Sequence, residues 1–260
     1  MNAQPAKKTT LALDIGGTGL KAALLDAAGH MISERLRTPT SYPMGPQELV
    51  HALTSLVAPL GTPTRAAAGF PGVIRGGLVL TAPHFVTKHG PGTAVDKALV
   101  KRWTGFDLDT ELQTALHCPV RVVNDAEMQA LPVITGSGVE VVVTLGTGVG
   151  SATYQDGVCG PHLELAHHPF HGTRTYNEYL GEAARHKVGN AAWRTRIVTM
   201  VKVLRTLLSF DHLYIGGGNS TRLDHPKVLR SLGANVSLID PNDGLIGAHF
   251  VWQHPGPVQP

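Results

Sequence analysis

Short apolar runs alternate with longer amphipathic stretches along the chain. The short runs have the length and the branched side chains of buried strands. They lie at residues 10–14, 20–25, 31–36, 66–70, 78–80, 120–123, 139–145 and 212–215. Apolar positions recur at helical spacing at 46–60, 94–103, 109–116 and 193–208. This alternation predicts an α/β protein.

The first two runs are separated by the stretch Gly16-Gly17-Thr18-Gly19. One interpretation is a dinucleotide fingerprint, in which a glycine turn at the start of a helix approaches a pyrophosphate. The other is a hairpin of two strands, whose turn directs amide N–H groups and a hydroxyl toward an anion. The stretch alone does not decide between them.

A second copy of the pattern favours the hairpin. Residues 13–19 are similar to residues 144–148 when one glycine is gapped, and in both copies small residues and then an aspartate follow. Two such units predict a duplicated domain with two phosphate loops, which a dinucleotide fold does not. A third cluster, 216–218, consists of three glycines after another strand. It would admit a flat ring or a phosphate close to the backbone, or serve only as a turn into a helix.

Composition limits the class of function. The chain has 260 residues, 42% of them hydrophobic, which suffices for one large domain or two modest ones. A net charge of +3 suits anionic small molecules better than a nucleic-acid duplex. Cys118 and Cys159 are too few for a disulfide scaffold. Since no run is long enough for a membrane helix and the first ten residues lack the apolar core of a signal peptide, we expect a cytoplasmic protein without nucleic-acid or membrane partners.

Two polar residues, Asn124 and Asp125, follow the apolar run 120–123. They would lie at the carboxyl end of a strand, where open α/β sheets bind ligands. A carboxylate there can accept the proton of a sugar hydroxyl that attacks phosphorus. The amide of Asn124 can both donate to and accept from neighbouring sugar hydroxyls. The alternative for Asp125 is an Asx turn or a helix N-cap.

Taken together, the motifs resemble the actin, sugar-kinase and chaperone ATPase superfamily. Gly69-Phe70-Pro71-Gly72, Val123-Asn124-Asp125-Ala126 and Glu164-Leu165-Ala166-His167 resemble, more specifically, the ROK family of sugar kinases. Within it, the short chain and the two phosphate loops are most similar to bacterial polyphosphate/ATP glucokinases. The resemblance implies a two-domain actin-like ATPase (ribonuclease H-like) fold, with a cleft between duplicated α/β domains.

The expected domains follow from that fold. Residues 1–122 would form an N-terminal α/β domain with the first phosphate loop, completed by a C-terminal helix near 243–253. Residues 123–242 would form a larger α/β domain with the second phosphate loop and the sugar motif. Residues 254–260 would be a flexible tail.

The resemblance also implies roles for individual residues. Asp125 would be the catalytic base. The sugar would be bound by Gly72, Asn124, Glu164, His167 and Glu178. Phosphates would be held by Gly16, Gly17, Thr18, Lys21, Gly146, Thr147 and Gly148, and a nucleotide by Gly216, Gly217 and Gly218. Asp14 would contact Mg²⁺ through water; for Lys21, the alternative is a position on an exposed strand face.

Two features depart from the family pattern. Ala166 stands where the family usually has glycine, which leaves the identity of the sugar open. The usual cysteine-rich zinc segment is absent, so no structural zinc is expected. The histidines at 162, 167, 168 and 171 include an i, i+4 pair that could hold a metal on a helix, but Pro169 argues against a regular helix there.

The sequence and this resemblance therefore predict a kinase that phosphorylates the 6-hydroxyl of glucose, or mannose, from polyphosphate, ATP or both. The resemblance also implies a homodimer. One alternative is an ATP-only hexokinase for another hexose. Two others are non-enzymatic: a sugar-responsive regulator, although a strand beginning by residue 10 leaves no room for a preceding helix-turn-helix domain, and a nucleotide-dependent scaffold. Basic residues form either a polyanion track or scattered surface charges. They are Lys88, Lys97, Lys101, Arg102, Arg174, Arg185, Lys187, Arg194 and Arg196.

Overall fold

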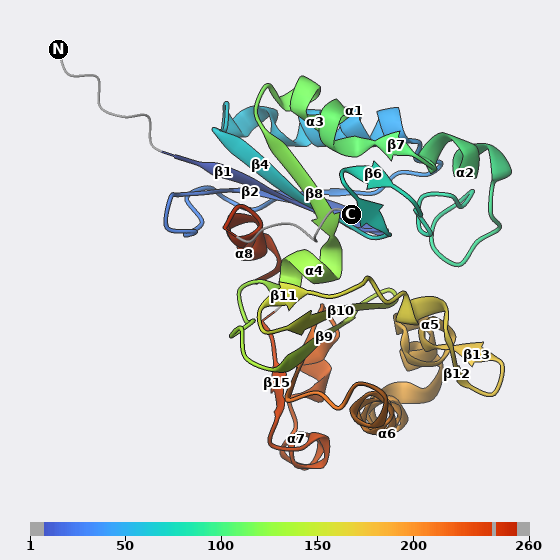
Figure 1. Cartoon of the computed structure of the whole chain (residues 1–260). Helices are drawn as coiled ribbons and strands as arrows, with labels where there is room; N and C mark the ends of the chain where they lie inside the picture. Colours follow the sequence, from blue (N-terminus) through green and yellow to red (C-terminus); the bar gives the residue numbers. More distant parts are fainter. Residues whose placement is uncertain (1–7, 241–242, 254–260) are drawn as a thin grey trace. The chain divides into compact units, whose positions relative to one another are not determined.

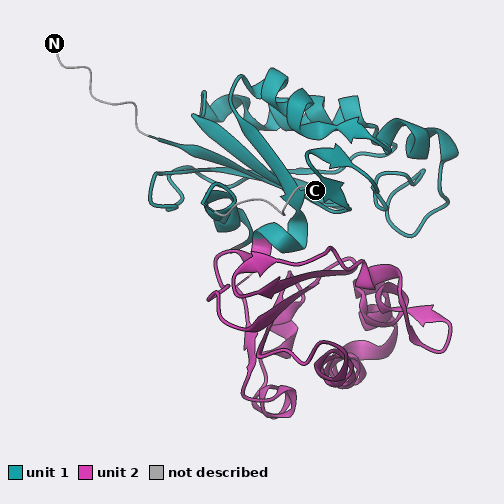
Figure 2. Cartoon of the chain, in the orientation of Figure 1, with its two compact units in different colours: residues 1–128, 244–255, 259 teal, residues 129–243, 256–258, 260 magenta. Residues whose placement is uncertain are grey.

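The computed structural model describes residues 8–240 and 243–253, which fall into two compact units (Figure 2). Unit 1 contains the chain up to Met128 and resumes at Gly244, and unit 2 contains Gln129–Asp243. Each unit is built around its own five-stranded sheet.

The sheet of unit 1 has the strand order β3-β2-β1-β4-β8 (Figure 1). Its strands are β1 (Thr10–Ile15), β2 (Gly19–Leu25), β3 (Leu36–Pro39), β4 (Arg65–Phe70) and β8 (Val120–Asn124). The first three strands are antiparallel neighbours, whereas β1, β4 and β8 run parallel. A smaller sheet contains β5 (Ile74–Arg75), β6 (Leu78–Val79) and β7 (Phe106–Asp107).

Helices cover the main sheet of unit 1, with α1 and α3 along one face (Figure 1). They are α1 (Pro46–Val57), η1 (Ala58–Leu60), α2 (Lys97–Trp103), α3 (Leu108–Leu116), α4 (Asp125–Ala130) and α8 (Asp243–Phe250). Leu49 and Leu53 of α1 and Leu112 of α3 are buried at helical spacing. The core also contains an aromatic cluster in which Phe85 stacks on Trp103 and Phe70 is tilted against both rings.

Unit 2 repeats the architecture of unit 1. Its sheet has the order β11-β10-β9-β14-β15, with the same sequence of two antiparallel and then two parallel pairings. The strands are β9 (Val139–Leu145), β10 (Val149–Gln155), β11 (Val158–Cys159), β14 (His212–Gly216) and β15 (Val236–Leu238). The matching topology confirms the hairpin interpretation and excludes a helix after the first glycine cluster.

The remaining elements of unit 2 are mostly helical. They are η2 (Leu165–His167), β12 (Pro169–His171), β13 (Arg174–Thr175), α5 (Tyr176–Leu180), α6 (Glu182–Leu208), η3 (Ser220–Leu223) and α7 (Pro226–Leu232). Helix α6 is interrupted at Gly189, whose φ of 78° no helical residue adopts. Trp193 of α6 is fully buried and donates its indole N–H to the Leu180 carbonyl at 2.7 Å.

Several elements differ from their predicted bounds. The run 31–36 is not a strand: Met31 makes only an isolated bridge to Leu25, and β3 begins at Leu36. The helix expected at 94–103 begins at Lys97, because the Asp96 side chain caps it by accepting from the Ala98 N–H. The helix expected at 193–208 is the second part of α6, which begins at Glu182 and is interrupted at Gly189.

The division between the units also differs from the expected boundary at 122/123. β8 pairs with β4 along its length, so Asn124 and Asp125 belong to unit 1 rather than to the second domain. The chain returns to unit 1 from Gly244, within α8. The tail expected at 254–260 lies outside the described residues. None of the helices in the described part of the chain has the length and apolar character to span a membrane.

Candidate active site

Three strand ends place polar groups at one edge of the unit 1 sheet. β1, β4 and β8 are parallel, and their register pairs Asp14 with Gly69 and Phe70 with Asn124. The first phosphate loop follows β1, the loop containing Gly72 follows β4, and Asp125 follows β8. Since the carboxyl ends of parallel strands form the ligand edge of α/β sheets, this edge is the candidate site in unit 1.

The first phosphate loop is a tight turn that is stabilised by hydrogen bonds from Thr40 and Tyr42. The Gly16 N–H donates to the Gly19 carbonyl at 3.0 Å. The Thr40 hydroxyl donates to the Gly16 carbonyl at 2.7 Å, and the Tyr42 hydroxyl to the Gly17 carbonyl at 2.6 Å. Burial raises the pKa of Tyr42 to about 12, so the phenol keeps its proton and remains a donor at neutral pH. Thr18 is exposed at the tip of the turn.

Asp14 and Lys21 face each other at the base of the same hairpin. The Lys21 Nζ lies 2.7 Å from Asp14 Oδ2, and both side chains are partly exposed. Lys21 therefore lies beside the predicted metal-contacting carboxylate rather than alone on a strand face. The pair places one positive and one negative group next to the phosphate loop.

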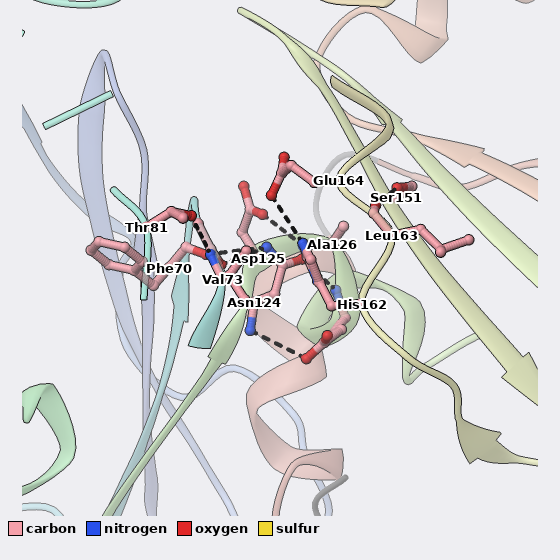
Figure 3. A network of polar contacts seen from close by, with 12 residues as sticks. Phe70, Val73, Thr81, Asn124, Asp125, Ala126, Ser151, His162, Leu163 and Glu164 are labelled. Atoms are coloured by element: carbon pink, nitrogen blue, oxygen red, sulfur yellow. Dashed lines mark hydrogen bonds and ion pairs between the residues drawn. The ribbon is translucent and has the colours of Figure 1, made fainter. Parts of the chain in front are cut away.

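Asn124 is buried, and its amide joins two segments of unit 1 (Figure 3). Its Nδ2 donates to the Gly72 carbonyl at 3.1 Å, and its Oδ1 accepts from the Ala126 N–H at 2.9 Å. These bonds fix the loop after β4 to the first turn of α4. A contact between Asn124 and a sugar stays a prediction, but the structure adds a positioning role that the sequence did not suggest.

Asp125 is the first residue of α4 and is half-buried. Its Oδ1 accepts from the Ala126 N–H at 2.9 Å. A Cβ on Gly69 would lie 3.2 Å from the Asp125 Cα, so the glycine allows α4 to start close against β4. Because α4 begins at Asp125, the structure agrees with the alternative in which Asp125 starts a helix. This position also keeps the Asp125 carboxylate at the ligand edge of the sheet.

The second phosphate loop lies in unit 2, between β9 and β10. Its Gly146 N–H donates to the Gly148 carbonyl at 2.9 Å, and Thr147 is exposed, as Thr18 is in the first loop. Asn177 of α5 supports it, because its Oδ1 accepts from the Val149 N–H at 2.7 Å. The second loop has no counterpart of Asp14 and Lys21, since Thr144 and Gly150 are paired at that register.

The third glycine cluster, 216–218, packs beside the second phosphate loop. The Asn219 N–H donates to the Leu145 carbonyl at 2.9 Å, and its Nδ2 donates to the Gly146 carbonyl at 3.2 Å. Gly217 has a φ of 81°, and a Cβ there would lie 2.5 Å from the Leu145 carbonyl oxygen. Glycine is therefore required at 217 for this close approach. The structure thus brings together the predicted phosphate and nucleotide glycines of unit 2.

The sugar motif forms a short 3₁₀ turn in unit 2. Glu164 precedes this turn, and its Oε2 lies 3.0 Å from Nε2 of His162 (Figure 3). His167 ends the turn and is exposed. The Ser151 hydroxyl donates to the Leu163 carbonyl at 2.5 Å, which ties the segment to β10. Their roles in sugar binding stay predictions.

Glu178 has a structural task that the sequence analysis did not assign. Its carboxylate accepts from the Thr175 N–H at 2.8 Å, while the Thr175 hydroxyl accepts from the Glu178 N–H at 3.2 Å. This reciprocal arrangement is a capping box at the start of α5. A carboxylate held in this way offers weaker support for the predicted sugar contact.

The histidine-rich segment shows no metal-binding geometry. Within residues 8–240 and 243–253, no group of three His, Cys, Asp or Glu side chains could hold a metal ion. His168 lies against Tyr176, and His171 stacks on Tyr179 with ring centroids 4.7 Å apart. As Pro169 suggested, the segment is not a regular α-helix: the short 3₁₀ turn η2 ends at His167, and β12 covers Pro169–His171.

The sequence analysis missed Thr40, Tyr42 and Asn177, which support the phosphate loops. Thr40 and Tyr42 each bond to a glycine more than 20 residues earlier in the chain. No local motif signals such contacts, because they depend on the pairing of β2 with β3. Asn177 is likewise 28 residues from Val149, the residue it supports.

The family model that describes the ROK family matches residues 10–173. That match covers well over half of the chain. The chain belongs to the ROK family. This confirms the resemblance drawn from the loops and from Gly69–Gly72, Val123–Ala126 and Glu164–His167.

Individual relatives agree with the family. A polyphosphate glucokinase from Mycobacterium leprae is 24% identical over 247 residues, covering 91% of this chain and 72% of the relative. An N-acetylmannosamine kinase from Escherichia coli is 35% identical over 154 residues, covering 57% of this chain and 48% of the relative. The solved inorganic polyphosphate/ATP-glucomannokinase from Arthrobacter sp. strain KM has a TM-score of 0.78 and 28% identity, covering 95% of this chain and all of that one. The ROK chain therefore has the actin-like ATPase fold predicted from its duplicated loops.

Proposed function

We propose that this ROK protein is a hexose kinase that transfers a phosphoryl group to the 6-hydroxyl of glucose, with mannose as an alternative acceptor. Inorganic polyphosphate, ATP or both would be the donor. Support comes from two relatives, one named a polyphosphate glucokinase and the other a polyphosphate/ATP-glucomannokinase. The proposal also requires that a proton-accepting side chain and a phosphate-binding loop lie near each other in the fold.

The observation that carries the proposal is the ligand edge of unit 1. A half-buried carboxylate, Asp125, follows β8 at the same sheet edge where the first phosphate loop follows β1. The Thr18 hydroxyl at the tip of that loop is exposed. A proton acceptor and a phosphate-binding turn thus lie on parallel strands of one sheet, as phosphoryl transfer to an alcohol requires.

In the proposed reaction, Asp125 accepts the proton of the sugar hydroxyl as its oxygen bonds to the terminal phosphorus of the donor. The bond between that phosphorus and the bridging oxygen breaks. ADP, or a polyphosphate shorter by one phosphate, leaves with the electron pair. The turn at Gly16–Thr18 and its counterpart at Gly146–Gly148 would hold phosphate oxygens through backbone N–H groups and threonine hydroxyls.

The residues at this edge fit the Mg²⁺ that the resemblance implies. Mg²⁺ in phosphoryl-transfer sites is held by one or two carboxylates, waters and the phosphates of the substrate. Asp14 supplies one partly exposed carboxylate. The Lys21 ammonium beside it is also partly exposed and would move aside when the carboxylate binds the ion. When bound, the ion would neutralise charge that develops on the phosphate oxygens.

A matrix of acceptors and donors tests the proposal. Glucose, mannose, N-acetylmannosamine and galactose would each be incubated with ATP or with nucleotide-free polyphosphate, and the sugar 6-phosphate measured directly. We expect product from glucose or mannose. Absence of sugar phosphate from every combination, in protein shown to be folded by circular dichroism, would refute kinase activity.

The second candidate is an ATP-dependent kinase for an N-acetylated hexose. It is favoured by the 35% identity to an N-acetylmannosamine kinase, although that match covers only 57% of this chain. Ala166 lies in the sugar motif and is buried, so its methyl group takes up volume that a glycine would leave open. The acceptor matrix with the wild-type protein distinguishes the two candidates, and Ala166→Gly should increase the rate with the bulkier acceptor.

Two further expectations complete the proposal. The family resemblance implies a homodimer, which size-exclusion chromatography with light scattering would test. We also propose that the enzyme works in the cytoplasm, where hexoses, ATP and polyphosphate meet. Fractionation of the source cells would test that location.

A further inference from the structure

One segment of unit 1, residues 81–95, packs on the first phosphate loop although no motif marks it. A Cβ on Gly17 would overlap with Nδ1 of His84 and would lie 2.9 Å from Cγ of Pro91. Gly90 in the same segment lies against the ring of Tyr42, whose hydroxyl bonds to the Gly17 carbonyl. The segment therefore touches the phosphate loop directly and through Tyr42.

The segment is held in a defined conformation. Phe85 is fully buried in the aromatic cluster, and the Phe85 N–H donates to the Ala82 carbonyl at 2.9 Å. Thr87 and Val95 form a bridge that closes the outer part of the segment into a narrow loop. Inside that loop, the Thr93 hydroxyl accepts from the His89 N–H at 3.1 Å. Side chains on the loop are thus presented from a fixed backbone.

The exposed groups on this loop are cationic or can become so. Lys88 and His89 are both exposed, and neither makes an ion pair within the described residues. Residues 81–95 contain no Asp or Glu. Lys88 and His89 lie three and two residues, respectively, before Pro91, which packs against Gly17. The segment that touches the phosphate loop therefore carries an exposed ammonium group with no ion-pair partner among the described residues.

The other basic residues considered in the sequence analysis are arranged differently. Arg102 pairs with Glu48 at 2.6 Å, and the buried Arg185 pairs with Glu182 at 3.2 Å. Arg194 donates to the Arg222 carbonyl, while Arg174 and Arg196 lie over the ring of Tyr179. Each of these five arginines therefore has a partner within its own unit. Lys88, by contrast, lies in the segment 81–95, which touches the first phosphate loop.

We propose that residues 81–95 form a subsite for the phosphate chain of inorganic polyphosphate, with Lys88 and His89 binding phosphates beyond those held by the first phosphate loop. The inference rests on the proposed kinase function and specifies the donor. A linear polyanion extends past the turn at Gly16–Thr18, whereas the three phosphates of ATP end in a nucleoside. The subsite therefore favours polyphosphate over ATP.

The test compares the double variant Lys88→Ala/His89→Ala with the control Lys202→Ala, which removes an exposed lysine of α6 in unit 2. The KM for long-chain polyphosphate should rise roughly threefold to tenfold in the double variant, as expected for two exposed charge contacts. The KM should also depend less steeply on salt concentration, because fewer counterions are displaced. The KM for ATP, the kcat and the control should stay at wild-type values.

A binding measurement makes the outcome independent of turnover. Fluorescently labelled polyphosphate would be titrated with each protein without hexose, and Lys88→Arg should restore the affinity that Lys88→Ala loses. An equal rise in KM for both donors would mean that the loop only supports the phosphate turn, and an unchanged KM for polyphosphate would also overturn the subsite. If the wild type phosphorylates hexoses from ATP but neither binds nor uses polyphosphate, the subsite is refuted while the kinase remains. Absence of sugar phosphate with both donors refutes the kinase itself.

Discussion

Lys21 Nζ and Asp14 Oδ2 lie 2.7 Å apart across the β1–β2 hairpin, immediately before the first phosphate loop. Both side chains are more than a fifth exposed, so this ion pair adds at most about 1 kcal/mol to the free energy of unfolding. The position next to the phosphate turn is a stronger reason for a lysine here than the stability it provides. We propose that Lys21 neutralises Asp14 in the unliganded protein and binds donor phosphates in the complex.

We therefore predict that Lys21→Met raises the KM for the phosphoryl donor several-fold and leaves the Tm within roughly 4 °C of the wild type. Initial rates at varied donor concentration and a thermal melt provide the two numbers. Lys202→Met is a suitable control, because Lys202 is an exposed lysine of α6 in unit 2. A large fall in Tm with an unchanged KM would mean that Lys21 serves the fold only.

The carboxylate of Asp125 is the proposed proton acceptor. In Asp125→Asn, the side chain keeps its size and can still accept from the Ala126 N–H. We expect kcat to fall by about 10²–10⁴, the usual contribution of a general base, with little change in hexose affinity. Isothermal titration with glucose and steady-state kinetics separate the two effects. Glu111→Gln, an exposed position on α3, is the matched control. Turnover near the wild-type value in Asp125→Asn would exclude Asp125 as the base.

Asn124 links the Gly72 loop to α4, so removal of its side chain should lower the stability of the folded protein. Asn124→Ala would leave the Gly72 carbonyl without its buried partner, while the Ala126 N–H would keep only its bond to Asp125 Oδ1. Each unsatisfied buried group costs about 1–3 kcal/mol, so a clear decrease in Tm is expected. A chemical-denaturation curve measures the loss of free energy. An unchanged midpoint would show that water or backbone groups replace the amide.

Tyr42 offers a test that separates donor binding from sugar binding. Tyr42→Phe deletes the hydrogen bond to the Gly17 carbonyl and little else, at a cost of about 1 kcal/mol. The phosphate turn should become less ordered, so the KM for donor should rise while the KM for hexose stays constant. Steady-state kinetics with each substrate varied in turn will measure both. Equal changes in the two KM values would contradict a role confined to the phosphate loop.

Much of this architecture could be predicted because its signals are local. The strand–turn–strand repeat at residues 13–19 and 144–148 predicts both hairpins, and the topology of each sheet agrees. Contacts between distant segments gave no such signal: the positioning role of Asn124 depends on Gly72, which lies 52 residues away in the chain. The capping box of Thr175 and Glu178 is local, and the Thr-x-x-Glu spacing could have predicted it. The strand expected at 31–36 failed because apolar residues there are interrupted by exposed polar ones, and pairing with β2 begins only at Leu36.

The last prediction concerns the pH dependence of stability. Asp109 of α3 accepts from the Val122 N–H at 2.6 Å, and burial raises its pKa to about 6 from an ordinary value of 3.8. Between pH 3.8 and 6, the folded protein therefore holds a proton that the unfolded chain has released. Stability falls as the pH rises through this window and stays at its lower level above it. An asparagine at 109 keeps the acceptor for Val122 but carries no charge at any pH.

Asp109→Asn should consequently be more stable than the wild type at pH 7.5, and this advantage should disappear toward pH 4. Thermal melts of both proteins across pH 4–8 provide the measurement. Burial lowers the pKa of His249, whose contribution is therefore lost as the pH falls. That effect has the opposite sign, but it is common to both proteins and cancels in the difference between their melting temperatures. A constant difference across the whole range would mean that the carboxyl of Asp109 titrates alike in the folded and unfolded chains, and that its burial beside Val122 is not what controls its protonation.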